Sequence, residues 1–129
     1  TRSLTAASAA LDSVTQNPYL ERIPVRRRDE TVILPVRQIA SVVANGELLH
    51  LTTIGNERFT ISYRLHALEA RLDPRRFVRL SRGTLAAVDQ IQKVSPMPGG
   101  TCQVQMANGQ VLQASRIQSR LLRDTLLRL

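Results

Sequence analysis

From Ile23 onwards the chain alternates between short apolar runs and pairs of turn-forming residues. Asn45-Gly46 is the strongest hairpin signal, because Asn and Gly tolerate the left-handed backbone of a tight turn. Gly55-Asn56 and Asn108-Gly109 are pairs of the same kind, and Asp29-Glu30 separates two β-prone runs. The pattern predicts strands over residues 23–28, 31–34, 40–44, 48–53, 58–61, 77–80, 90–94, 101–106 and 110–114.

Three segments have helical spacing instead. Pro35 at a first helical position predicts one turn over residues 35–39, and leucines predict a short helix over residues 63–72 that ends before Asp73-Pro74. Ser115 is a predicted N-cap for a final helix through about residue 127. The apolar side of this helix comprises Ile117, Leu121, Leu122 and Leu126. Its leucines, together with Leu127, are expected to pack in the core rather than against a partner helix.

The composition changes near residue 20. Residues 1–20 are rich in Ala, Ser and Thr and predict a linker, whereas residues 21–129 have the length of one domain. The chain begins without Met, carries no hydrophobic signal core and lacks the roughly 18 apolar residues of a membrane span. We therefore expect a piece of a longer cytoplasmic protein, without membrane contact of its own. The single Cys102 is expected to be a small buried hydrophobe on a strand.

The chain is strongly basic. It has 18 Lys and Arg against 10 Asp and Glu, with a formal charge of +8. Lys93 is the only lysine, so a compositional bias explains the choice of Arg but not the excess of bases over acids. This excess favours a polyanionic partner, either nucleic acid or an acidic membrane surface.

The sequence contains no recognisable set of residues for catalysis or cofactor binding. His50 lies in an apolar strand and His66 on a predicted helix, neither with a nucleophile or carboxylate at a readable spacing. Gly99-Gly100 lies in a loop between strands rather than between a strand and a helix, so it does not predict a phosphate-binding loop. We expect a protein that is not an enzyme and binds no metal or cofactor.

Two motifs suggest a family. One is Phe77-Val78-Arg79-Leu80-Ser81-Arg82-Gly83, and the other runs from Asn108-Gly109 through a strand to Ser115-Arg116. Together they resemble the LytTR family of bacterial DNA-binding domains, which has an aromatic-x-Arg-x-His-Arg-Ser run, an Asn/Asp-Gly hairpin and a Ser-Arg pair that opens the last helix. The resemblance extends from about residue 20 to the C-terminus. It implies a mainly β fold, an elongated β-sandwich of several small antiparallel sheets with short helices, including one C-terminal helix.

The resemblance implies DNA contacts from the first motif by Arg79, Ser81 and Arg82. Arg can pair bidentately with guanine or with phosphate, and Ser can bond to bases or backbone. Ser81 replaces the usual His of the family and Gly83 the usual Ser, so base preference is expected to differ. The alternative is that Arg79 and Arg82 are ordinary solvated charges at a strand end.

Further contacts are implied for Ser115, Arg116 and Arg120 at the last helix. Arg116 and Arg120 share one helix face, and the free amides of a helix start attract phosphate. Ile117 stands where the family often has a second basic residue, which leaves open whether Arg116 or Arg120 reads bases; Ser115 can also serve as a cap alone. Asn45 lies in a loop that reaches DNA in the family, although Asn before Gly is also a common turn residue.

By resemblance, the function is sequence-specific binding of double-stranded promoter DNA by the output domain of a bacterial transcriptional regulator, such as a response regulator of a two-component system. Loops would contact successive major grooves of direct-repeat sites. The resemblance also implies an upstream receiver or sensory domain and a possible dimer on DNA. Two alternatives remain: a β-rich RNA-binding module, which normally needs exposed aromatic residues, and a protein-interaction domain with incidental charge.

Overall fold

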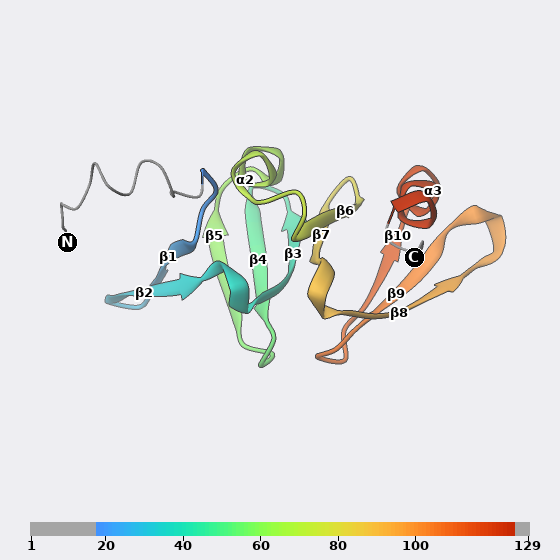
Figure 1. The fold of residues 1–129 in the computed structure, drawn as a ribbon. Helices are drawn as coiled ribbons and strands as arrows, with labels where there is room; N and C mark the ends of the chain where they lie inside the picture. Colours follow the sequence, from blue (N-terminus) through green and yellow to red (C-terminus); the bar gives the residue numbers. More distant parts are fainter. Residues whose placement is uncertain (1–17, 126–129) are drawn as a thin grey trace.

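Three small antiparallel sheets follow one another along the molecule (Figure 1). The computed structural model describes residues 18–125. The first sheet is a hairpin of β1 (Arg22–Arg27) and β2 (Glu30–Pro35). The middle sheet has the order β5-β4-β3-β7-β6 and consists of β3 (Ile39–Asn45), β4 (Leu48–Thr53), β5 (Arg58–Ser62), β6 (Phe77–Ser81) and β7 (Thr84–Ala87). The third sheet consists of β8 (Ile91–Pro96), β9 (Cys102–Met106) and β10 (Val111–Ala114).

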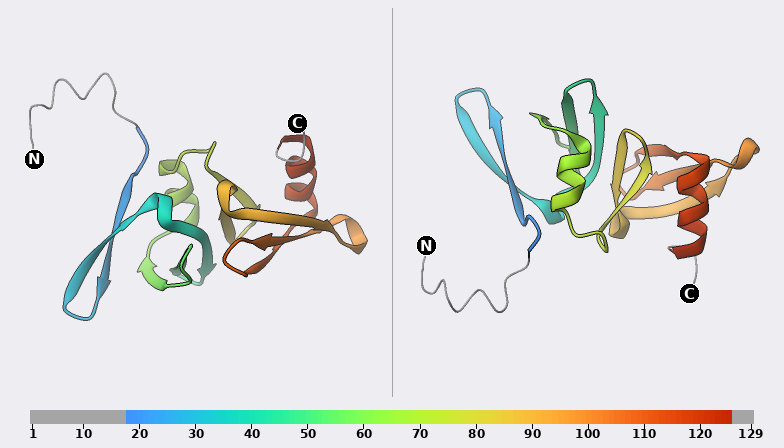
Figure 2. Two further views of the ribbon diagram at one scale, coloured as in Figure 1. Left: turned by 60° about the horizontal axis from the view of Figure 1, so that its bottom comes forward. Right: turned by 90° about the horizontal axis from the view of Figure 1, so that it is seen from above.

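The helices are short. Within the described residues, the α-helices are α2 (Leu65–Arg71) and α3 (Arg116–Thr125), and 3-10 turns are η1 (Val36–Gln38), η2 (Val88–Gln90) and η3 (Pro98–Gly100). None of the described helices is long and apolar enough to cross a membrane. Figure 2 shows α2 beside the middle sheet and α3 beside the third. The predicted mainly β fold of several small antiparallel sheets, with a C-terminal helix, is confirmed.

The middle sheet is covered on both faces, which makes the molecule an elongated sandwich. In β3, Ile39 and Val42 lie in one core with residues of the β1–β2 hairpin and α2, whereas Ala40 lies in a second core with the third sheet and α3. Side chains alternate between the faces of a strand, so a strand with both faces covered becomes buried at successive positions. Cys102 belongs to the second core and is buried on β9, as predicted.

Strand β7 was not among the predicted strands. Its sequence Thr-Leu-Ala-Ala shows no apolar alternation, and alanine has a weak strand preference. Leu85 faces the first core and Ala86 the second, so neighbours on both sides of the sheet, rather than local preference, determine this strand.

The expected apolar face of the last helix was wrong in part. Leu122 is fully buried in the second core, but Ile117 and Leu121 are 71% and 48% exposed. Leu126 and Leu127 lie outside the described residues. The helix packs through Leu122 and the small Ser119, whose hydroxyl donates a hydrogen bond to the Ala114 carbonyl at 3.2 Å, so its buried stripe is narrower than its apolar one.

Polar side chains join the middle and third sheets. The Ser41 hydroxyl donates to the Gln110 side-chain oxygen at 2.8 Å, and the Asn108 side-chain amide donates to the Thr53 carbonyl at 3.1 Å. The Asn56 side-chain amide in turn donates to the Asn108 backbone carbonyl at 3.0 Å. These bonds fasten the β9–β10 turn to the β4–β5 turn, at the lower edge of the molecule in Figure 1.

Candidate nucleic-acid interface

The turn between β6 and β7 presents Arg82. Ser81 pairs with Thr84, so Arg82 and Gly83 form a two-residue turn, and Arg82 is exposed. The Gly83 amide donates to the Ser81 hydroxyl at 3.4 Å, which places the Ser81 side chain within its own turn. The first motif therefore ends in a compact hairpin with a guanidinium at its exposed tip.

This turn is attached to the end of β3. The amide of Ala44 donates to the carbonyl of Gly83 at 2.7 Å. Asn45 is the next residue, exposed, and Gly46 takes the left-handed conformation at φ +64 that the tight β3–β4 turn requires. Asn45 and Arg82 therefore lie close together at the ends of their strands in the middle sheet, although they are distant in the sequence.

The start of α3 is attached to β6 as well. The amide of Ser115 donates to the Leu80 carbonyl at 2.8 Å, and the Ser115 hydroxyl accepts a bond from the Gln118 amide at 3.3 Å. This second bond satisfies a helix-end donor and confirms the predicted N-cap role of Ser115. Arg116 and Arg120 are both exposed, one helical turn apart.

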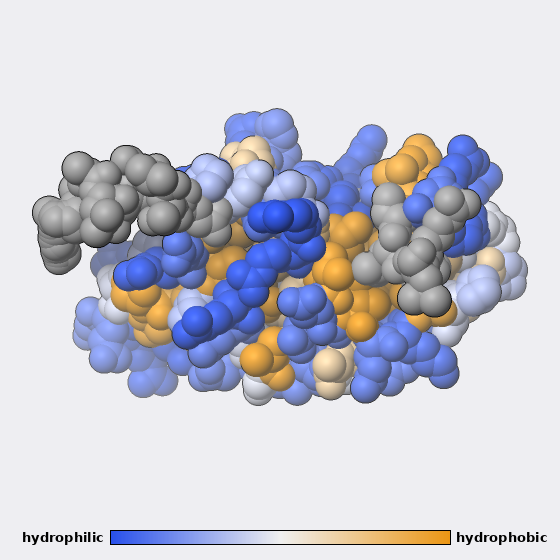
Figure 3. Space-filling model, viewed as in Figure 1, coloured by the Kyte–Doolittle hydropathy of each residue, from blue (hydrophilic) through white to orange (hydrophobic). Residues whose placement is uncertain are grey.

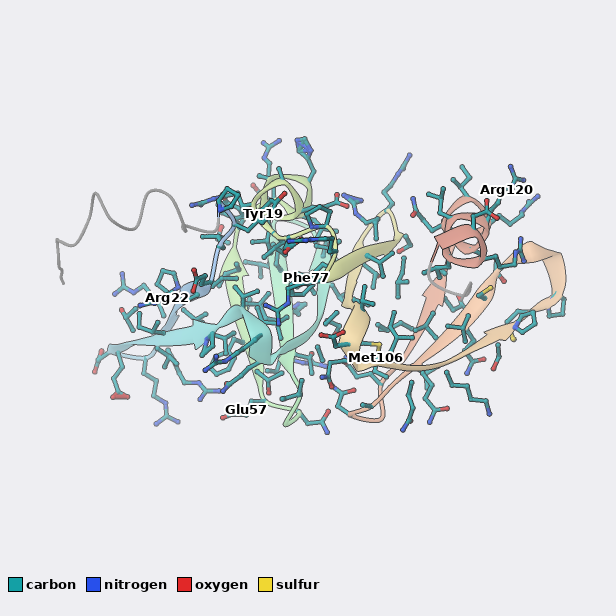
Figure 4. The ribbon with its side chains drawn as sticks, viewed as in Figure 1. Tyr19, Arg22, Glu57, Phe77, Met106 and Arg120 are labelled. Carbon is teal, nitrogen blue, oxygen red and sulfur yellow. The ribbon has the colours of Figure 1, made fainter. Side chains whose placement is uncertain are left out.

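Three segments therefore meet around β6: the β3–β4 turn, the β6–β7 turn and the first turns of α3. We call this surface the candidate interface; its residues are Asn45, Ser81, Arg82, Ser115, Arg116 and Arg120. Figure 4 shows Arg120 on α3 at the upper right, and Glu57 of the β4–β5 turn on the opposite, lower edge.

The stem of Arg116 is held against a neighbouring turn. A side-chain carbon added at Gly100 would lie 3.3 Å from Cγ and Cδ of Arg116. Gly100 in η3, at φ +88, therefore leaves room for the aliphatic part of Arg116. Arg116 is still exposed, so packing restricts the direction of its side chain without removing its charge from water.

Arg79 differs from the other predicted contacts, because its guanidinium bonds within the protein. Nη2 lies 3.0 Å from a carboxylate oxygen of Glu69 on α2, and Nη1 donates to the Arg82 carbonyl at 3.1 Å. The side chain is 21% exposed, and its Nε is buried without a hydrogen-bond partner. Arg79 lies behind the β6–β7 turn, and sequence reasoning missed Glu69.

The charges of the first sheet lie apart from the candidate interface. The Arg27 guanidinium stacks 4.4 Å from the centroid of the Phe59 ring and donates to the Arg58 carbonyl at 3.4 Å. Figure 1 shows the β1–β2 hairpin and α3 at opposite ends of the molecule. The arginines of this hairpin therefore form a separate basic region.

The described residues expose few aromatic rings and hold no cluster of metal-ligand side chains. Phe59 and Phe77 are buried and Tyr19 is half-buried, which leaves Tyr63 as the exposed ring among the Phe and Tyr residues of the range 18–125. No group of three or more His, Cys, Asp or Glu side chains able to hold a metal ion occurs in that range. His50 instead pairs with the Thr60 hydroxyl, at 3.1 Å.

The comparisons with known proteins point to one family. The family model of the LytTr DNA-binding domain matches residues 29–127. A similar solved structure is the LytTr DNA-binding domain of a putative methyl-accepting/DNA response regulator from Bacillus cereus, with a TM-score of 0.76 and 20% identity over 83% of this chain and 97% of that one. At this identity the likeness shows the fold alone. The comparison with curated proteins gave no match. The family match covers well over half of the chain, and the chain belongs to the LytTR family of DNA-binding domains.

Proposed function

We propose that this chain binds specific sites in double-stranded promoter DNA through the candidate interface, as the output domain of a bacterial transcriptional regulator. The observation that carries the proposal is the meeting of three cationic or polar segments around β6, through the bonds from Ala44 to Gly83 and from Ser115 to Leu80. These two turns and the helix start lie on the same side of the molecule. This arrangement would allow loops to contact successive major grooves of the DNA.

Each exposed residue has a role that fits its position. Arg82 is at the tip of a rigid two-residue turn, from which its forked donors can reach guanine O6 and N7 or a phosphate. The Asn45 amide can pair with adenine from the adjacent turn. Both contacts would read bases, so these two turns are our principal specificity elements.

The start of α3 combines phosphate and base contacts. Its first amides carry the positive end of the helix dipole and favour a phosphate there. Arg116, next to the cap, is assigned to a base, and Arg120, about 5–6 Å further along the same face, to a phosphate. Ser115 orders the helix start as its cap.

Arg79 lies behind the candidate interface and Ser81 lies within it, and in this proposal both position Arg82 rather than contact DNA. The Ser81 hydroxyl accepts a bond inside its own turn, and the Arg79 guanidinium bonds to Glu69 and to the Arg82 carbonyl. These bonds support a role in setting the direction of Arg82 rather than a contact with DNA.

The regulatory context follows by analogy. The Bacillus cereus relative is described as part of a putative methyl-accepting/DNA response regulator. We propose that residues 21–129 are the DNA-binding unit of a cytoplasmic two-component regulator and that residues 1–20 connect it to a receiver or sensory domain. Binding to direct repeats would bring two copies of the domain together on DNA. We propose that DNA binding requires no cofactor.

A salt titration tests the binding class. A duplex selected from a random library by the chain is titrated at several salt concentrations, with a scrambled duplex and a single-stranded RNA of the same length as comparisons. The proposal predicts preference for the selected duplex and a slope of log K against log[salt] of about −0.9 per phosphate contact, several units overall. A nearly flat plot would favour the protein-interaction alternative, and tighter RNA binding would favour the RNA module.

A further inference from the structure

Ile117 is the most exposed large hydrophobic side chain of the described residues. It is 71% exposed, compared with 55% for Val111 and 54% for Ile33. Single exposed apolar residues are common on protein surfaces, so exposure alone assigns no role. The position of Ile117 is more informative, since it is the second residue of α3, in the helix turn that carries Arg116.

The surroundings of Ile117 are cationic. A shallow hollow at the surface is lined by Ser115, Arg116, Ile117 and Arg120. Figure 3 shows a small orange patch over α3, bordered by blue. Among the described residues of this helix, the exposed large apolar side chains are Ile117 and Leu121, and they supply far less than the about 800 Å² per partner of a stable protein interface. Arginines on both sides of Ile117 also favour an anionic occupant over a second copy of this basic chain.

We propose that Ile117 contacts the C5-methyl group of a thymine in the major groove and so determines specificity at that position. This inference rests on the proposed function. The thymine methyl is the apolar group that standard bases present in the major groove, and apolar side chains recognise it. In this arrangement Arg116 and Arg120 contact the DNA on either side of Ile117, while the Ile117 side chain and the thymine methyl group shield each other from water.

Deoxyuridine provides the test, because it pairs like thymine but lacks the methyl group. Each thymine of the selected duplex is replaced in turn, and affinity is measured for the wild type and for Ile117→Ala. We expect one thymine per half-site at which replacement weakens wild-type binding about fourfold, the effect of burying one methyl group. Ile117→Ala should bind the thymine and deoxyuridine duplexes equally, about as weakly as the wild type binds the deoxyuridine duplex.

Two further variants serve as controls. Ile117→Leu keeps an apolar side chain and should retain most of the methyl preference. Ile33→Ala removes a similarly exposed side chain from β2, at the opposite end of the molecule, and should retain all of it. Because Ile117 is exposed, its alanine variant should unfold at the wild-type temperature, which thermal melting checks.

The outcomes separate the inference from the proposed function. A wild type that is indifferent to every thymine replacement, or an Ile117→Ala variant that keeps the wild-type methyl preference, overturns the role of Ile117. Selective, salt-dependent duplex binding would then still support the proposed function. Absence of any duplex binding would overturn both.

Discussion

At the scale of single residues, the bonds of Arg79 indicate that it positions Arg82 rather than contacts DNA itself. Its guanidinium links Glu69 on α2 to the carbonyl of Arg82, at 3.0 and 3.1 Å. Charged hydrogen bonds of this length restrict the turn that presents Arg82. A direct contact with DNA would require Arg79 to leave these partners.

Arg79→Ala and Glu69→Gln form a diagnostic pair. If Arg79 positions the turn, both variants should weaken binding to the selected duplex severalfold while the salt slope stays at its wild-type value. Glu57→Gln, which changes an exposed carboxylate in the β4–β5 turn, is the control for lost negative charge. If Arg79 contacts phosphate directly, Arg79→Ala should reduce the slope by about 0.9 and Glu69→Gln should not weaken binding.

Asp73, after α2, gives a prediction for acid stability. Its carboxylate accepts a bond from the Arg75 amide at 2.9 Å and pairs with the Arg75 guanidinium at 3.4 Å. The backbone bond, followed by the side-chain bond, lowers the pKa of Asp73 from its ordinary 3.8. A lowered pKa in the folded state contributes stability above about pH 4, which is lost as the pH falls through the folded-state value.

Thermal unfolding of the wild type and Asp73→Asn between pH 7 and pH 3 tests this sign. The wild type should have the higher Tm at pH 7, and the difference should shrink below about pH 4, where the unfolded-state carboxyl takes up a proton. Asp29→Asn, in the exposed β1–β2 turn, is the control. A difference in Tm that stays constant to pH 3 would contradict the role of the Asp73 charge.

At the scale of elements, the β9–β10 turn fastens the third sheet to the middle one. Asn108 bonds to the Thr53 carbonyl and to the Gln110 side chain, both at 3.1 Å, and its side-chain oxygen accepts from the Gln110 amide at 3.0 Å. The Asn-Gly pair is therefore both a hairpin turn and a junction between sheets.

Asn108→Ala should lower the free energy of unfolding by about 1–2 kcal/mol, because it leaves partly buried polar groups without partners. Denaturant unfolding measures this value. Gln113→Ala, an exposed change on the neighbouring strand β10, should change it by less than about 0.5 kcal/mol. Equal effects of the two variants would show that Asn108 acts only as a turn residue.

Strands that have one buried face and are bounded by a pair of turn-forming residues could be predicted from sequence. The cap at Ser115 could be predicted as well, because these features depend on residues that are neighbours in the sequence. Strand β7 could not, since its two buried faces depend on two separate cores. Helical spacing placed Ile117 and Leu121 on the same apolar side as Leu122, because it counts apolar residues but does not show how wide a stripe the third sheet covers.

The grouping of the candidate interface also lay beyond local reasoning. The bond from Ala44 to Gly83 joins segments far apart in the sequence, and so does the bond from Ser115 to Leu80. The motif indicated Arg82 and Arg79 as equivalent, but alternation along β6 directs Arg79 towards α2, where Glu69 meets it. Only the packed fold distinguishes the two.

At the scale of the whole molecule, two cores on either face of the middle sheet hold a row of three sheets, and one edge of that row carries the candidate interface. The formal charge of +8 attracts any polyanion, so charge alone gives affinity without specificity. We propose in addition that specificity resides at the turns and the helix start around β6.

The central measurement compares Arg82→Ala with Arg26→Ala, a change in the β1–β2 hairpin, on selected and scrambled duplexes at one fixed salt concentration. We predict that Arg82→Ala loses about 1–3 kcal/mol of affinity for the selected duplex and little for the scrambled one. Arg26→Ala should leave the preference between the duplexes unchanged. If Arg82→Ala keeps its fold and prefers the selected duplex as strongly as the wild type does, the proposed role of the candidate interface in specificity is contradicted.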